Sequence, residues 1–122
     1  KDKTVLITDD DMRNIFALSS ALQEYEIKII IATNGIEALQ KLKEHEEIDL
    51  VLMDVQMPNM NGYDATKEIR AIEKGNDIPI IAITAGILAH ERERCFEAGM
   101  DDYLSKPIIK DDLETILTKW LV

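Results

Sequence analysis

The sequence predicts a doubly wound α/β domain, with a parallel sheet covered by helices on both faces. Short apolar runs of strand length recur along the chain. Segments with helical spacing separate these runs, and such alternation of strand and helix is typical of parallel sheets. The runs are apolar at successive positions, so both faces of the sheet need covering. The five runs lie at residues 5–7, 28–31, 50–53, 80–83 and 103–105.

The segments between the runs carry apolar residues at the spacing of one helix face. Asn34 is a typical N-cap for the second helix. Gly99 follows the fourth, as glycine commonly does at a helix C-terminus. The fourth segment, residues 88–98, is highly charged and has the weakest apolar stripe. The apolar positions are Ile15, Leu18 and Leu22, then Ile36, Leu39 and Leu42, then Ala65, Ile69 and Ile72, and finally Leu113, Ile116, Leu117, Trp120 and Leu121.

The size of the chain predicts one domain spanning residues 1–122. Its 122 residues, 46% of them hydrophobic, suit one compact unit with one core. The chain begins at Lys1 rather than at methionine, so we expect this domain to be a piece of a longer protein.

Charge and hydropathy exclude several classes of partner. The net charge of −10 opposes binding to phosphate backbones, so we expect no direct nucleic-acid binding. No apolar stretch approaches the roughly 20 residues of a membrane span, which predicts no membrane insertion by this domain. The single cysteine, Cys95, allows no intrachain disulfide and suits a reducing compartment. We therefore expect a cytoplasmic location, which a membrane anchor elsewhere in the parent chain would not contradict.

Polar residues with distinct chemistry follow four of the apolar runs. Asp9 and Asp10 follow the first run, Asp54 the third, Thr84 the fourth and Lys106 the fifth. If the runs are parallel strands, these endings share the sheet edge where open α/β folds place their ligand sites. The sequence therefore predicts a site made of carboxylates, a hydroxyl and an ammonium.

The acidic residues have a structural and a functional interpretation. A carboxylate before a helix serves as a cap, worth about 0.3 to 2 kcal/mol, and this suits Asp11. It suits Asp54 poorly, because no helical pattern follows that residue. Grouped carboxylates repel one another unless a cation neutralises them, and Mg²⁺ accepts carboxylates together with phosphate oxygens. The pattern favours phosphoryl chemistry, with Lys106 either assisting the phosphoryl oxygens or simply pairing with a surface acid.

Four motifs follow one another along the chain: Asp9-Asp10, residues 52–58 with Asn61-Gly62, residues 82–85, and residues 103–107. In their order and spacing, these motifs resemble the receiver domain of two-component response regulators, over essentially the whole chain. The sequences of residues 57–62 and 97–103 are most similar to receivers fused to hybrid sensor histidine kinases. This resemblance implies a flavodoxin-like, five-stranded parallel sheet of order 2-1-3-4-5.

The resemblance also assigns roles at the predicted site. Asp54 would be the phosphoacceptor. Asp10 and Asp54 would bind Mg²⁺ with the backbone carbonyl of Gln56, while Asp9 would act mostly through bound water. Lys106 would contact the phosphoryl group.

A further pair implied by the resemblance is the switch formed by Thr84 and Tyr103. The inferred function is Mg²⁺-dependent transfer of a phosphoryl group from a partner phosphohistidine to Asp54. The partner would be a histidine kinase or a histidine-phosphotransfer domain, and a dimer that forms on phosphorylation is compatible with the family. Whether the chain counts as an enzyme stays open, since a receiver assists its own phosphorylation and dephosphorylation.

Three other functions compete with this interpretation. An acid phosphatase-like hydrolase usually has a second aspartate two residues beyond the first, where this chain has Gln56. A nucleotide-binding domain would need a glycine-rich loop, but the five glycines are scattered. The strongest rival is a receiver fold used only for protein interaction and never phosphorylated.

Overall fold

Strands and helices alternate along the whole chain, as the sequence predicts. The computed structural model describes residues 3–55, 62–71, 78–84, 89–105 and 109–121. No helix in these ranges is long and apolar enough to cross a membrane. The strands are β1 (Thr4–Thr8), β2 (Lys28–Ala32), β3 (Leu50–Asp54), β4 (Ile80–Thr84) and β5 (Asp102–Ser105), and the helices are α1 (Met12–Gln23), α2 (Gly35–Glu44), α3 (Gly62–Ala71), α4 (Ala89–Ala98) and α5 (Lys110–Leu121).

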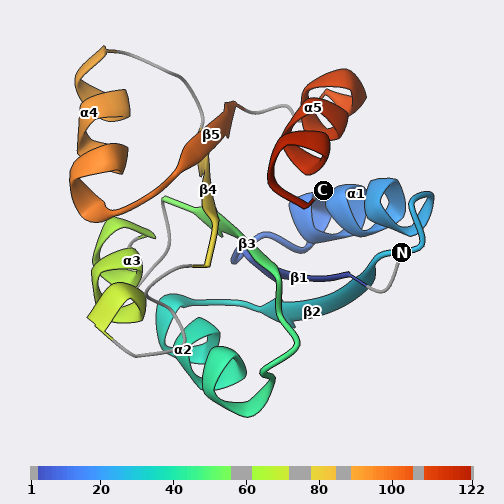
Figure 1. Cartoon of the computed structure of the whole chain (residues 1–122), viewed down its shortest axis with the longest axis horizontal. Coiled ribbons are helices and arrows are strands. Elements are labelled where there is room, and N and C mark those ends of the chain that lie inside the picture. Colours follow the sequence, from blue (N-terminus) through green and yellow to red (C-terminus); the bar gives the residue numbers. More distant parts are fainter. Residues whose placement is uncertain (1–2, 56–61, 72–77, 85–88, 106–108, 122) are drawn as a thin grey trace.

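The five strands form one parallel sheet in the order β2-β1-β3-β4-β5. This confirms the order implied by the resemblance. Figure 1 shows α1 and α5 on one face of the sheet, and α2, α3 and α4 on the other. The doubly wound arrangement leaves the carboxyl ends of β1 and β3 side by side at the point where the strand order reverses.

Each face of the sheet has its own apolar core, because successive side chains of a strand point to opposite faces. Leu6, Val51 and Met53 pack in the cluster that includes residues of α2, α3 and α4. Ile7 and Leu52 pack in the cluster that includes residues of α1 and α5. All five are fully buried, so the central strands are covered on both sides as predicted.

The described helices lie in the predicted segments, and one predicted apolar position differs from the structure. The fourth helix, α4, buries Cys95 and Ala98 although its apolar stripe is weak. Ile36, expected on the apolar face of the second helix, is 52% exposed, because the first turn of α2 turns its side chain outward. The N-cap prediction is confirmed, since the Asn34 side chain accepts a hydrogen bond from the backbone N–H of Glu37 at 2.8 Å.

Exposed polar contacts tie α1 to α5 on their shared face. The Tyr25 hydroxyl donates a hydrogen bond to Glu114 Oε2 at 2.8 Å, and this bond raises the pKa of Tyr25. The Lys110 ammonium lies 2.8 Å from Glu24 Oε1, and that contact raises the pKa of Lys110. Both contacts are exposed, so they orient the two helices more than they stabilise them.

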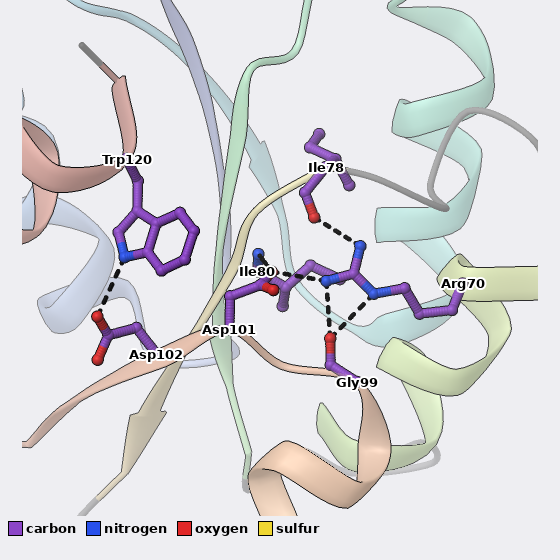
Figure 2. A network of polar contacts seen from close by, with 7 residues as sticks. All are labelled: Arg70, Ile78, Ile80, Gly99, Asp101, Asp102 and Trp120. Atoms are coloured by element: carbon purple, nitrogen blue, oxygen red, sulfur yellow. Dashed lines mark hydrogen bonds and ion pairs between the residues drawn. The ribbon is translucent and has the colours of Figure 1, made fainter.

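Arg70 ties the end of α3 to the beginnings of β4 and β5 (Figure 2). Its Nε and Nη2 donate to the Gly99 carbonyl at 2.9 and 2.7 Å, and its Nη1 donates to the Ile78 carbonyl at 2.6 Å. Nη2 also lies 2.7 Å from Asp101 Oδ2, which accepts the backbone N–H of Ile80 at 2.9 Å. One guanidinium therefore fixes the beginnings of both strands, at the opposite end of the strands from the predicted site.

We expect Arg70→Lys to lower the free energy of unfolding by about 2 kcal/mol, because an ammonium cannot reproduce the planar set of donors that an arginine offers. Urea unfolding followed by circular dichroism measures the change. Arg13→Lys is the matched control, since the Arg13 side chain is 92% exposed and should be replaced without measurable loss. Equal stability of the two variants would contradict the role given to Arg70.

Candidate functional site

Three carboxylates meet at the carboxyl edge of the sheet. The side chains of Asp9, Asp10 and Asp54 each place an oxygen within 4.8 Å of the others. The pairing of β1 with β3 is the cause, because Thr8 pairs with Met53 and each strand continues directly into its acidic residues. The structure thus brings together the three acidic residues that the sequence predicts for the site.

Asp9 is held firmly although it lies just beyond β1. Its backbone N–H donates to the carbonyl of Ala32 at 3.1 Å, which extends the contact between β1 and β2. Its Oδ1 accepts the backbone N–H of Asp11 at 2.9 Å, and its side chain is fully buried. Asp11 in turn caps α1 by accepting the N–H of Arg13 at 2.9 Å, as predicted. The start of α1 therefore fixes the position of Asp9.

Asp54 and Asp10 differ in their exposure. Asp54 is the last residue of β3, is 2% exposed, and pairs with Ile83 of β4. The next residue, Val55, donates its N–H to the Ile83 carbonyl at 3.1 Å, which holds the end of the strand in place. Asp10 is exposed to solvent. The cluster thus has a buried, rigid side and an accessible side, as a site that receives a ligand from solution requires.

The chemistry of the cluster is that of a hard-cation site. Two unit charges about 4.8 Å apart repel by about 3 kcal/mol at an effective dielectric constant of about 20. A divalent cation relieves this repulsion, and carboxylate oxygens are the ligands that Mg²⁺ prefers. The donor set of Asp9, Asp10 and Asp54 therefore fits Mg²⁺.

The predicted switch residues lie on the neighbouring strands. Thr84 ends β4, is 3% exposed, and follows Ile83, the partner of Asp54 in the sheet. Tyr103 lies in β5 opposite Ala82, and its half-buried side chain packs against the core shared with α2, α3 and α4. Thr84 thus stands at the same sheet edge as the carboxylates, with Tyr103 on the next strand. Their roles in switching stay predictions.

Two predicted site residues, Gln56 and Lys106, lie outside the described residues. The backbone carbonyl of Gln56 and the ammonium of Lys106 keep their predicted roles on sequence grounds alone. The described strands that lead to them, β3 and β5, both end at the carboxylate edge.

Comparison with known proteins gives a consistent result. Residues 5–118 match the family model for the response regulator receiver domain. Similar proteins include the sensor histidine kinase GacS of Pseudomonas protegens, 40% identical over 119 residues, and the sensor histidine kinase RcsC of Escherichia coli, 41% identical over 117 residues. These alignments cover 95% and 96% of this chain, but only 13% and 12% of the two relatives.

Solved structures agree in fold. The receiver domain of the sensor histidine kinase PA1611 from Pseudomonas aeruginosa, solved with a magnesium ion coordinated in its active site cleft, is 37% identical with a TM-score of 0.90, covering 98% of this chain and 97% of that one. The receiver domain of Saccharomyces cerevisiae Ssk1, in its co-crystal with the histidine phosphotransfer protein Ypd1, is 33% identical with a TM-score of 0.90, covering 97% and 88%.

We expect Asp54→Asn to raise the free energy of unfolding by about 1 to 2 kcal/mol when divalent cations are removed with EDTA. The amide keeps the shape of the side chain and removes one buried charge from the cluster. Urea unfolding in EDTA measures the effect.

Asp111→Asn is the control variant for this unfolding measurement. Asp111 lies exposed in the first turn of α5, where a negative charge favours the helix, so its loss should lower stability by a few tenths of a kcal/mol. If Asp54→Asn also lowered stability, repulsion within the cluster would not be a significant energetic feature of this site.

Proposed function

The chain belongs to the response regulator receiver family, and from that premise we propose that it accepts a phosphoryl group on the carboxylate of Asp54. The observation that carries the proposal is the gathering of Asp9, Asp10 and Asp54 within 4.8 Å at the switch point of the sheet. A single buried carboxylate needs no further carboxylates beside it. Two acidic neighbours are favourable where a cation and a phosphoryl group are bound together.

The donor we propose is a phosphohistidine on a histidine kinase or a histidine-phosphotransfer domain. The similarity to receivers within GacS and RcsC supports a role in the relay of a hybrid histidine kinase. The co-crystal of the Ssk1 receiver with Ypd1 supports a phosphotransfer protein as the immediate partner. The net charge of −10 disfavours nucleic acid as a direct partner.

In the proposed reaction, a carboxylate oxygen of Asp54 attacks the phosphorus of the donor. The new bond joins this oxygen to phosphorus as the bond between phosphorus and the imidazole nitrogen breaks, and the leaving imidazole takes up a proton. The contribution of the protein is to hold the nucleophile in line, and the end of a buried strand provides this rigidity. Val55, bonded to Ile83 at 3.1 Å, restrains the backbone immediately after the nucleophile.

Asp10 and Asp54 would hold Mg²⁺ together with the carbonyl of Gln56, and Asp9 would act through bound water. The metal, when bound, supplies charge neutralisation for the phosphoryl oxygens. Asp9 is the residue best suited to orient such a water, because its carboxylate is buried and its Oδ1 is already fixed by the N–H of Asp11 at 2.9 Å.

We propose that Thr84 and Tyr103 respond to the new phosphoryl group. The hydroxyl of Thr84 would donate a hydrogen bond to a phosphoryl oxygen, and Lys106 would pair with another. The inward movement of Tyr103 would follow the displacement of Thr84. The main rival is an interaction module of the same fold that is never phosphorylated.

We expect one labile adduct of phosphoryl mass on the wild-type protein after incubation with acetyl phosphate and Mg²⁺. Asp54→Asn should form none, because the amide is not a nucleophile toward phosphorus. Intact-mass spectrometry with rapid quenching measures the product.

Asp111→Asn is the matched control, because it removes a carboxylate that is not part of the cluster and should be modified like the wild type. An adduct on Asp54→Asn would place the acceptor elsewhere. No adduct on a folded wild-type protein would favour the interaction-only module.

We also expect Mg²⁺ to raise the melting temperature of the wild-type protein. Free Mg²⁺ at about ten times its dissociation constant should stabilise the fold by about 1.4 kcal/mol. This corresponds to a rise of about 5 °C for a domain of this size, and EDTA should reverse it. Differential scanning fluorimetry on wild type, Asp54→Asn and Asp111→Asn checks this, with the rise lost only in Asp54→Asn. An equal rise in all three would assign Mg²⁺ to another place on the molecule.

A further inference from the structure

The carboxylate of Asp102 joins the backbone of Tyr103 to the last turn of α5. Its Oδ1 accepts the backbone N–H of Tyr103 at 2.9 Å. Its Oδ2 accepts the indole Nε1–H of Trp120 at 3.1 Å, and the ammonium of Lys119 lies 3.3 Å from the same oxygen. Figure 2 shows the Asp102 carboxylate directed toward the Trp120 indole.

This bridge lies at the edge of the sheet. β5 has β4 on one side only, so the N–H of Tyr103 needs an acceptor other than a strand, and Asp102 provides it. The Asp102 side chain is only 18% exposed, so its hydrogen bonds are partly shielded from water. Lys119 also lies 5.4 Å from the centre of the Trp120 ring, which helps to hold the indole in place.

A carboxylate suits this position better than an amide of the same shape. Tyr103 and Trp120 both present N–H donors, so the side chain between them needs two acceptor oxygens. An amide of the same shape has one acceptor and one donor, and would leave one of the two N–H groups facing another donor. The bridge therefore depends on the chemical identity of Asp102 and not only on its size.

The beginning of β5 is also fixed from the opposite face. Asp101 Oδ2 accepts a hydrogen bond from Nη2 of Arg70 in α3 at 2.7 Å. Asp102 Oδ2 instead accepts a hydrogen bond from Trp120 and forms an ion pair with Lys119, both in α5. Figure 2 shows Arg70 and Trp120 on opposite sides of the strand. The contact with Arg70 therefore fixes Asp101, the residue immediately before the Asp102 bridge.

We propose that Asp102 is a positioning residue that couples the backbone of Tyr103 to the C-terminal turn of α5. The occupancy of the Asp54 site is thereby communicated to the end of α5. This inference rests on the proposed phosphorylation of Asp54, and it assigns a defined route for the signal on the α1 and α5 side of the sheet. Trp120 is the single tryptophan of the chain, so it reports on this route directly.

The test follows indole fluorescence and intact mass on the same sample after adding acetyl phosphate and Mg²⁺. In the wild type, the emission of Trp120 should change with the same time course as the phosphoryl adduct. In Asp102→Asn, the adduct should form while most of the emission change is lost. A purely structural role for Asp102 would alter stability but would not separate the adduct from the emission change.

Glu114→Gln is the matched control, because it also removes a carboxylate of a contact to α5, the one from Tyr25, without touching Tyr103. It should keep the full emission change. The proposal is wrong if Asp102→Asn keeps the full change, if Glu114→Gln loses it equally, or if the wild type forms the adduct with no change in emission. Absence of the adduct in the wild type would instead overturn the proposed function, and this inference with it.

Discussion

The register between β1 and β3 is the constraint on which the site depends. These strands pair in parallel although they are not consecutive in the chain, and Thr8 stands opposite Met53. Any shift by one residue would reverse the side-chain directions of a strand and move Asp54 away from Asp9. The register is secured by buried residues on both faces, since Ile7 and Leu52 pack on one side and Leu6 and Val51 on the other. Apolar burial thus provides the free energy that holds like charges together.

The two faces of the sheet are held in different ways. On the side of α2, α3 and α4, the partly buried guanidinium of Arg70 joins α3 to the backbone around Ile78 and Gly99. On the side of α1 and α5, the polar contacts are mostly exposed, as between Tyr25 and Glu114. Exposed pairs are weak and partly buried charged hydrogen bonds are stronger. The exposed contacts of α5 therefore restrain it less than the Arg70 contacts restrain α3, and the partly buried bridge from Asp102 to Trp120 is the exception.

The sequence alone predicts the alternation of elements, because strands buried on both faces leave an unmistakable apolar pattern. It also predicts the acidic cluster, because Asp54 ends such a strand with no helix to cap. The prediction that Ile36 is buried is wrong, because helical spacing alone does not show which side of the first turn of α2 is covered by the rest of the protein. The contacts of Arg70 and Asp102 could not be predicted, because they join residues 29 and 18 positions apart, and no periodicity indicates which partner a charged side chain will contact.

Energetics indicate why a signal in this fold needs more than one contact. A hydrogen bond from the Thr84 hydroxyl to a charged phosphoryl oxygen contributes about 1.5 to 3 kcal/mol. Moving a population from 1:99 to 99:1 requires about 5.5 kcal/mol, so Thr84 alone is insufficient. The remainder has to come from charge neutralisation at the site and from contacts that differ between the two states. Partly exposed contacts such as that of Asp102 with Lys119 suit this purpose, because their modest strength lets two arrangements of α5 lie close in free energy.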